Sequence, residues 1–186
     1  MAEIGTDIQK AASLLRRGKL VAIPTETVYG LAGNAFNEEA VLSIFETKNR
    51  PQFDPLIVHS SSIQWVKEHV AEIPQIARIL MDEFWPGPMT LVLPKKENIP
   101  DLVTSGLDSV AVRVPSHPMT QELLQMLDFP LAAPSANPFG YVSPTTAQHV
   151  NDQLGDKIDY ILDGGSTTVG LESTIIGFED GKPIIY

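Results

Sequence analysis

The chain has 186 residues, of which 43% are hydrophobic and 19% charged, with a formal net charge of −10 and no cysteine. This length suits a single domain, and the lack of cysteine excludes a disulfide framework and a thiolate metal site. A surface with this charge repels a phosphate backbone, so we expect no tight nucleic-acid binding by this chain alone. A local basic pocket for a small anion remains compatible with it, because the field in a cleft depends on nearby groups.

Neither a membrane span nor a secretory signal is apparent. No apolar run approaches the roughly 20 residues needed to cross a bilayer. The N-terminal stretch MAEIGTDIQKAAS has no basic flank followed by an apolar block. We therefore expect a cytoplasmic protein without membrane association.

The first half of the chain alternates helical and extended patterns. Thr6 and Gln9 are spaced as a capping box, and Asn37 is a favourable helix N-cap, with acidic residues following it in the first turn. In chain order, the pattern predicts a helix from 6 to about 17, a strand at 20–23, a turn-rich loop at 24–33, a helix starting at 37, a strand at 56–58, and helices near 62–70 and 74–84.

The second half continues the alternation after the chain-breaking WPGP at 85–88. Ser143 followed by Pro144 favours a helix start, with serine as N-cap and proline in the first helical position. The pattern predicts strands at 89–93, 110–114, 131–133, 158–162 and 173–178, helices at 118–127 and 143–154, and a surface loop at 94–108. Strands alternating with helices indicate an α/β domain with a largely parallel or mixed sheet.

Prolines and hydroxyl side chains recur where predicted strands end. They occur in IPTETVYG (23–30), VRVPSH (112–117) and LAAPSAN (131–137), and KNRPQFDPLIVH (48–59) adds Lys48 and Arg50. Ligands of open α/β sheets bind beyond the carboxyl ends of the strands. The candidate ligand-binding residues at these ends are Thr25, Thr27, His59, Arg113, Ser135, Asn137 and Ser143. The alternative is ordinary turn chemistry, since Pro, Ser, Thr and Asn favour loops on local grounds.

Three cations allow two interpretations each. Strand alternation places Arg113 on the face opposite Val112 and Val114, where a buried guanidinium needs an anionic partner. That partner is either an internal Asp or Glu, or a substrate carboxylate held by the bidentate fork. Lys48 and Arg50 either grip a polyanion or form a solvated helix C-terminus that the helix dipole favours.

Several common signatures are missing. GxSxG, GxxxxGK[ST] and GxGxxG do not occur, and the four histidines lack metal-ligand spacing, so no metal site is predicted. The start of the helix predicted after Ser143 is a candidate anion cradle. The segment GGSTTVGLEST (164–174) is either a loop that folds over a ligand or a plain connection.

Taken together, six segments resemble the YrdC/TsaC family of threonylcarbamoyl-AMP synthases. They are PTETVYGL (24–31), KNRPQFDPLIVH (48–59), WPGPMTLVL (85–93), VAVRVPSHP (110–118), PLAAPSANPFGYVSPTTAQHV (130–150) and GLESTII (170–176). The resemblance implies a twisted, mixed parallel and antiparallel α/β sheet flanked by helices, with a concave ligand site, over a single domain at 1–186. It also implies a further segment after Tyr186, in which the family carries an Arg-Pro-Gly sequence whose arginine helps to hold ATP.

The resemblance implies an L-threonylcarbamoyladenylate synthase, a nucleotidyltransferase that joins L-threonine, bicarbonate and ATP and releases pyrophosphate. Magnesium would arrive with ATP, and the product would pass to a complex that forms threonylcarbamoyladenosine on tRNA. By motif position, L-threonine would meet Thr27, His59, Arg113, the Ala133 backbone and Ser173. ATP would meet Lys48, Arg50, Asp54, Ser109, Ser135, Asn137 and Ser143, with Lys48 and Arg50 as charge stabilisers.

The sequence departs from the family at Asp54, and two other functions are alternatives to the one that the resemblance implies. Asp54 stands where the family usually has asparagine, so an added negative charge beside the triphosphate would either weaken nucleotide binding or favour a bridging magnesium ion. The enzyme rival is a carbamoyl-adenylating domain like that of hydrogenase-maturation carbamoyltransferases, whose cysteine-rich zinc modules this chain lacks. The other rival is a non-catalytic RNA-binding module, which the charge of −10 disfavours.

Overall fold

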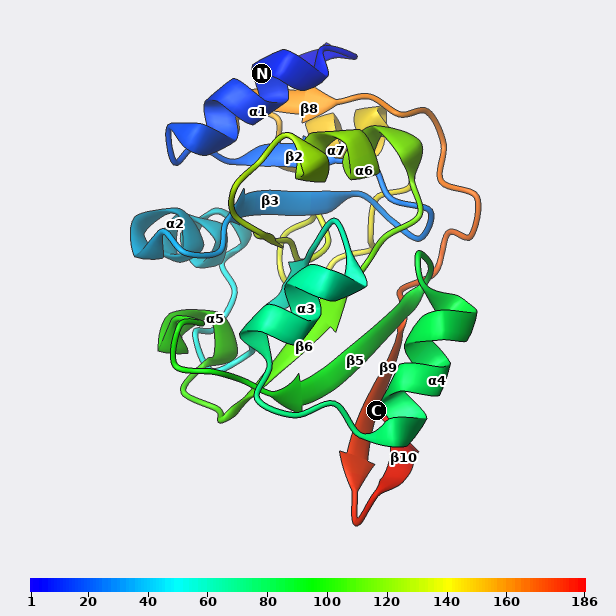
Figure 1. Cartoon of the computed structure of the whole chain (residues 1–186). Coiled ribbons are helices and arrows are strands. Elements are labelled where there is room, and N and C mark those ends of the chain that lie inside the picture. Colours follow the sequence, from blue (N-terminus) through cyan, green and yellow to red (C-terminus); the bar gives the residue numbers. More distant parts are fainter.

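The computed structural model describes every residue from Met1 to Tyr186, and extended segments along the whole chain form strands. The strands are β1 (Glu3–Gly5), β2 (Val21–Ile23), β3 (Gly30–Asn34), β4 (Ile57–His59), β5 (Met89–Pro94), β6 (Ser109–Arg113), β7 (Leu131–Ala132), β8 (Tyr160–Leu162), β9 (Thr174–Glu179) and β10 (Lys182–Ile185). They make one ten-stranded sheet in the order β1-β8-β2-β3-β7-β4-β6-β5-β9-β10 (Figure 1).

The sheet is mixed, as predicted. Pairs β1–β8, β2–β8, β4–β6 and β5–β9 run parallel, whereas β2–β3, β3–β7, β4–β7, β5–β6 and β9–β10 run antiparallel. Strands that are neighbours in the sheet come from distant parts of the chain, so the sheet order brings several of the recurring strand-end motifs together.

Seven helices connect and cover the strands. They are α1 (Ile8–Arg16), α2 (Glu38–Lys48), α3 (Ile63–His69), α4 (Gln75–Phe84), α5 (Asp101–Thr104), α6 (Pro118–Gln125) and α7 (Ala147–Leu154). None of them combines the length and the hydrophobicity that crossing a bilayer would require.

Apolar side chains fill both faces of the sheet. Alternate residues of one strand enter different clusters: Ala22 packs in the larger cluster with residues of α2, whereas Val21 and Ile23 pack with residues of α1 and α6. Successive side chains of a strand point to opposite faces, so helices on both sides are needed to bury them. This explains why β2 reads as a continuous apolar run instead of an alternating pattern.

Two predicted helix starts are wrong. Asp7, not Thr6, is the N-cap of α1, because its carboxylate accepts a hydrogen bond from the amide of Lys10. The helix predicted from Ser143 begins only at Ala147, capped by Thr146. The Pro144 carbonyl instead accepts from the amide of Tyr29 at 2.8 Å. This tertiary contact keeps Ser143 and Pro144 in the loop before α7. No helix therefore begins directly after Ser143.

Two segments predicted as loops contain regular structure. Strand β3 occupies the end of the predicted 24–33 loop, and the short helix α5 lies inside the predicted 94–108 loop. The glycines of GLAGN suggest a turn. In the structure, however, Gly33 lies in a strand and allows neighbouring side chains to pack closely against the backbone. A Cβ there would lie 3.0 Å from the side chain of Leu20 and 3.2 Å from that of Ile44. The edge strands β1 and β10, of three and four residues, were also missed.

Helix α2 allows a matched test of this packing. Ile44 is fully buried in the larger cluster, whereas Leu42 on the same helix is 37% exposed. We expect Ile44→Ala to lower the free energy of unfolding by about 2–5 kcal/mol, from lost burial and the cavity left behind. Leu42→Ala should cost less than about 1 kcal/mol. Urea unfolding of both variants measures this, and equal losses would contradict the described orientation of α2.

Candidate functional site

Two adjoining cavities lie among the strand-end motifs. The larger, about 540 Å³, and the smaller, about 40 Å³, share the lining residues Ile57, Pro134, Ser135, Glu172 and Ser173. Of the twelve residues that the family resemblance implicates, those lining the larger cavity are Arg50, Asp54, Ser109, Ser135 and Ser173. Those lining the smaller cavity are Thr27, His59, Arg113, Ala133, Ser135 and Ser173. Lys48, Asn137 and Ser143 line neither.

Strand pairing sets the geometry of the smaller cavity. His59 and Arg113 end the parallel strands β4 and β6 and are direct partners in the register. The antiparallel strand β7 lies on the other side of β4 and leads into Ala133, whose amide donates to the Ile57 carbonyl at 3.0 Å. Three of the predicted residues therefore meet because their strands are neighbours in the sheet.

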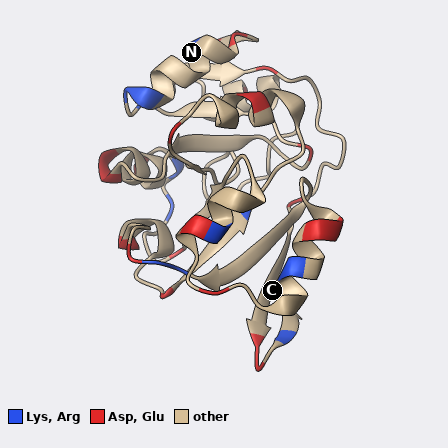
Figure 2. Cartoon of the chain, viewed as in Figure 1, with Lys and Arg blue, Asp and Glu red and all other residues tan.

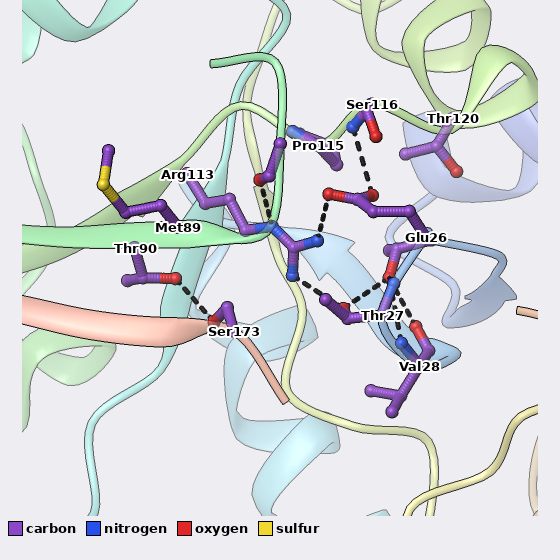
Figure 3. Close-up of polar contacts among 12 residues, drawn as sticks. Glu26, Thr27, Val28, Met89, Thr90, Arg113, Pro115, Ser116, Thr120 and Ser173 are labelled. Carbon is purple, nitrogen blue, oxygen red and sulfur yellow. Dashed lines mark hydrogen bonds and ion pairs between the residues drawn. The ribbon is translucent and has the colours of Figure 1, made fainter. Parts of the chain in front are cut away.

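Arg113 sits at the centre of a buried polar network (Figure 3). Its Nη2 donates to Glu26 Oε1 at 2.6 Å, and its Nη1 donates to Thr27 Oγ1 at 2.9 Å. Its Nε donates to the Gly87 carbonyl at 3.2 Å, in the WPGP turn. Of the two possible partners for this guanidinium, the structure shows an internal carboxylate. A guanidinium has five N–H groups, so two remain for a ligand.

Glu26 was missed by the sequence analysis. Its second oxygen, Oε2, accepts from the amide of Ser116 at 3.1 Å, and its carbonyl accepts from Val169 at 2.8 Å. Glu26 thereby links the 24–29 loop to the end of β6 and to the 164–173 segment. The usable signal was the requirement for an anion partner of Arg113, because Glu26 is the only acid within PTETVYGL.

His59 is buried beside Arg113, and its Nδ1 has no hydrogen-bond partner within the protein. Burial lowers the pKa of His59 to about 3, and the charge of Arg113 adds to this effect. The imidazole is therefore neutral at pH 7 and offers the smaller cavity an uncharged polar nitrogen.

Ser173 joins the two cavities. It directly precedes β9, and its hydroxyl lies 2.8 Å from that of Thr90 on β5, whose side chain is fully buried. Because β5 and β9 pair in parallel with Thr90 opposite Ile175, the sheet fixes where Ser173 stands.

Lys48 lies next to the larger cavity without lining it. Its side chain is buried, and Nζ donates to the carbonyls of Ser135 and Asn137. Burial lowers its pKa to about 7, and the nearby charge of Arg50 contributes to the lowering. The two hydrogen bonds from Lys48 thus hold the 135–137 turn in place. Lys48 is therefore not a solvated side chain at a helix C-terminus. Asn137 has an unpartnered Oδ1, and its Nδ2 donates to the carbonyls of Pro138 and Tyr141.

Arg50 and Asp54 form an ion pair at the edge of the larger cavity. Arg50 Nη2 lies 3.0 Å from Asp54 Oδ2, and the guanidinium also donates to the carbonyls of Asp54 and Pro55. The guanidinium lies 5.8 Å from the centre of the Phe139 ring. The negative charge of Asp54 is therefore balanced locally by its neighbour.

Glu172 is a second acid that the sequence analysis missed. It lines both cavities, and its Oε1 accepts a hydrogen bond from Ser143 Oγ, which brings Ser143 to the rim of the site. Within the 164–174 segment, Val169 and Gly170 donate amide hydrogen bonds to the carbonyls of Glu26 and Thr27. The segment therefore lies over the loop that carries Thr27.

Charged side chains elsewhere lie mainly on helices and connections, and the central strands carry few (Figure 2). No three His, Asp or Glu side chains are grouped so that they could hold a metal ion. The arrangement offers polarised hydroxyls, oriented N–H donors and cations, and no hydroxyl that lines the cavities is hydrogen-bonded to a histidine. Such a site can position and stabilise anionic ligands.

The fold and the two cavities define an α/β protein with a mixed sheet and two adjoining polar cavities at its strand ends. The Sua5/YciO/YrdC family model, described as "Telomere recombination", matches residues 13–186. The chain belongs to this family.

Similarity to individual proteins is also high. A threonylcarbamoyl-AMP synthase from Pyrococcus abyssi is 50% identical over 178 residues, which cover 96% of this chain and 52% of that protein. The chain therefore spans about half the length of this curated relative. A crystal structure of P. abyssi Sua5 complexed with L-threonine matches with a TM-score of 0.95 at 46% identity, covering 100% of this chain and 56% of the other. Full-length HypF in a phosphate- and nucleotide-bound form matches with a TM-score of 0.84 at 27% identity, covering 96% and 28%.

The Arg113–Glu26 pair should be important for stability. The Glu26→Gln change replaces one carboxylate oxygen, which accepts a hydrogen bond from either Arg113 or Ser116, with an NH₂ group. This NH₂ group then faces another donor, and the guanidinium loses its counter-charge. We expect unfolding free energy to fall by about 3 kcal/mol. The control is Glu3→Gln, since Glu3 pairs with Lys10 at 2.5 Å but the side chains are 62% and 40% exposed. That change should cost at most about 1 kcal/mol. Similar losses in a denaturant titration would show that Glu26 is not the buried partner described.

Proposed function

We propose that the protein is an L-threonylcarbamoyladenylate synthase, which converts L-threonine, bicarbonate and ATP into threonylcarbamoyl-AMP and pyrophosphate. The observation that carries the proposal is the pair of adjoining cavities with shared lining residues. The small one contains a guanidinium with free N–H groups. The larger one is lined by Arg50, and Lys48 lies next to it. The 50% identical relative of that name and the 46% identical structure with bound L-threonine support it.

In this proposal, L-threonine occupies the smaller cavity. Its carboxylate takes the two remaining N–H groups of Arg113, because a guanidinium matches the planar geometry of a carboxylate. Its other polar groups contact Thr27, His59, Ser173 and the backbone of Ala133. The cavity is much smaller than the one of about 540 Å³ beside it, so we place the smaller of the two organic substrates there.

ATP occupies the larger cavity, lined by Arg50, Asp54, Ser109 and Ser135, with Ser143 at its rim through Glu172. Lys48 acts from behind the 135–137 turn, and Asn137 shapes this turn. Magnesium enters as the counter-ion that ATP carries. Because Arg50 already balances Asp54, the phosphates meet a site that is locally less acidic than the net charge of the chain implies.

The chemistry is adenylation by positioning. The threonine amine takes up carbon dioxide, supplied by bicarbonate, to give a carbamate. A carbamate oxygen then attacks the α-phosphorus of ATP, so one P–O bond forms while the bond to the β-phosphate oxygen breaks and pyrophosphate leaves. This step asks the protein mainly for alignment and charge stabilisation, which the cations, hydroxyls and oriented amides can provide.

The proposal extends to the setting of the reaction. One sheet that runs from β1 to β10 supports a single domain at 1–186. The shared name of the relatives supports a role in tRNA threonylcarbamoyladenosine biosynthesis, and we place the reaction in the cytoplasm. The product would be consumed by a separate tRNA-modifying transferase complex.

The direct test is pyrophosphate release from ATP by the purified protein. We expect release only when L-threonine and bicarbonate are both present, and mass spectrometry should detect threonylcarbamoyl-AMP. Arg113→Lys, which keeps the charge but loses the planar fork, should raise the KM for threonine at least about tenfold. Release that continues unchanged without threonine or without bicarbonate would refute the assignment.

A carbamoyl-adenylating activity is the second candidate, because the structural match to HypF is close. The two functions differ in their carbamoyl source. Replacing threonine and bicarbonate with carbamoyl phosphate separates them, since only the second function makes carbamoyl-AMP from it. We expect no such product.

Lys48 makes nucleotide binding depend on pH. With a pKa of about 7 in the free protein, Lys48 is mostly neutral at pH 8, whereas a bound triphosphate favours the ammonium. ATP binding at pH 8 should therefore take up protons, and affinity should fall as the pH rises from 6 to 8.5. Calorimetry in buffers of different ionisation enthalpy measures the uptake. Lys48→Arg stays charged throughout this range, so the same uptake in this variant would exclude Lys48 as its source.

A further inference from the structure

Thr25 lies two residues before Thr27 in the loop between β2 and β3, and the two hydroxyls are in contact. Thr25 is buried and lines the smaller cavity. Its Oγ1 donates to the Val28 carbonyl at 2.6 Å, accepts from the amides of Thr27 and Val28 at 3.2 Å each, and lies 2.8 Å from Thr27 Oγ1.

These contacts decide which way the Thr27 proton points. A hydroxyl carries one proton and two lone pairs. Since the Thr25 proton is directed at the Val28 carbonyl, the proton between the two hydroxyls comes from Thr27. The two longer amide contacts then share the second lone pair of Thr25. On its other side, Thr27 Oγ1 accepts from Arg113, whose guanidinium can only donate. Thr27 thus has one lone pair left and no proton to give to a ligand.

We infer that Thr25 is a positioning residue for the amino-acid site, which holds the Thr27 hydroxyl as an acceptor beside the donors of Arg113. The inference rests on the proposed function, in which L-threonine occupies the smaller cavity. Two adjacent groups of opposite hydrogen-bonding sense fit a ligand that carries both a carboxylate and a donor such as an amine. A ligand with a carboxylate alone leaves the Thr27 lone pair unpaired, and a buried unpaired acceptor lowers affinity.

The test measures ligand discrimination. Calorimetry compares L-threonine with 3-hydroxybutanoate, which is threonine without its amine. In Thr25→Val the Thr27 hydroxyl can turn and donate to a carboxylate, so we expect the ratio of the two affinities to shrink about 10-fold, the value of one hydrogen bond. Thr25→Ser keeps the hydroxyl and should restore the ratio. In the activity assay, the KM for threonine should rise with Thr25→Val while the KM for ATP changes little.

A matched control separates positioning from stability. Thr120 is also buried, and its hydroxyl donates to the carbonyl of Pro24, the residue before Thr25. Thr120→Val removes a buried hydroxyl bond to the same loop but leaves the Thr25–Thr27 contact in place. We expect a lower melting temperature with the wild-type affinity ratio. If Thr25→Val does not fold, Thr25→Ala removes the same hydroxyl without adding an apolar branch.

The outcomes distinguish the inference from the proposed function. If the wild-type protein binds no L-threonine, the proposed function fails and the inference fails with it. If the wild type binds L-threonine but a folded Thr25→Val or Thr25→Ala variant keeps the wild-type ratio, only the inference is overturned. Equal weakening of both ligands would show that Thr25 merely shapes the turn.

Discussion

The organisation of the site depends on one buried guanidinium. Arg113 ends a central strand, and its contacts with Glu26, Thr27 and Gly87 tie two other motifs to that strand. Glu26 extends the network to Ser116 and to the 164–173 segment. A charge withdrawn from water requires such partners, so the need to compensate Arg113 fixes loops that no regular secondary structure holds. The same partners leave part of the guanidinium free, which is the part the proposed reaction uses.

The two cavities differ in how their charges are arranged. Beside the smaller one, the Arg113–Glu26 ion pair and the neutral His59 give directed polarity, and the carboxylate of Glu172 lines both cavities. At the edge of the larger one, Lys48 and Arg50 are held by backbone carbonyls, and Asp54 offsets part of their charge. Preorganised dipoles of this kind stabilise developing charge without reorganising. An acidic protein can therefore keep a site for a polyanionic ligand.

Much of the fold followed from local patterns, and the failures share one cause. Helix α2 could be placed because Asn37 caps it and Ile44 and Phe45 supply its apolar face. The Ser-Pro pair at 143–144 suggested a helix start, but a backbone bond from a residue over a hundred positions away prevented it. The motifs located the strand-end residues, whereas Glu26 and Glu172 had no periodic signal. Partners that only the folded chain brings together cannot be derived from spacing alone.

The sheet order also has a consequence for folding. Thr27, His59, Arg113, Ala133 and Ser173 come from segments spread over most of the chain and meet only when β3, β7, β4, β6, β5 and β9 have paired. Contacts between such distant segments form slowly because their loop-closure entropy is lost first. Partially folded chains therefore lack the complete binding surface. Any small molecule that fills this surface binds the native state alone and shifts the population away from unfolded chains by mass action.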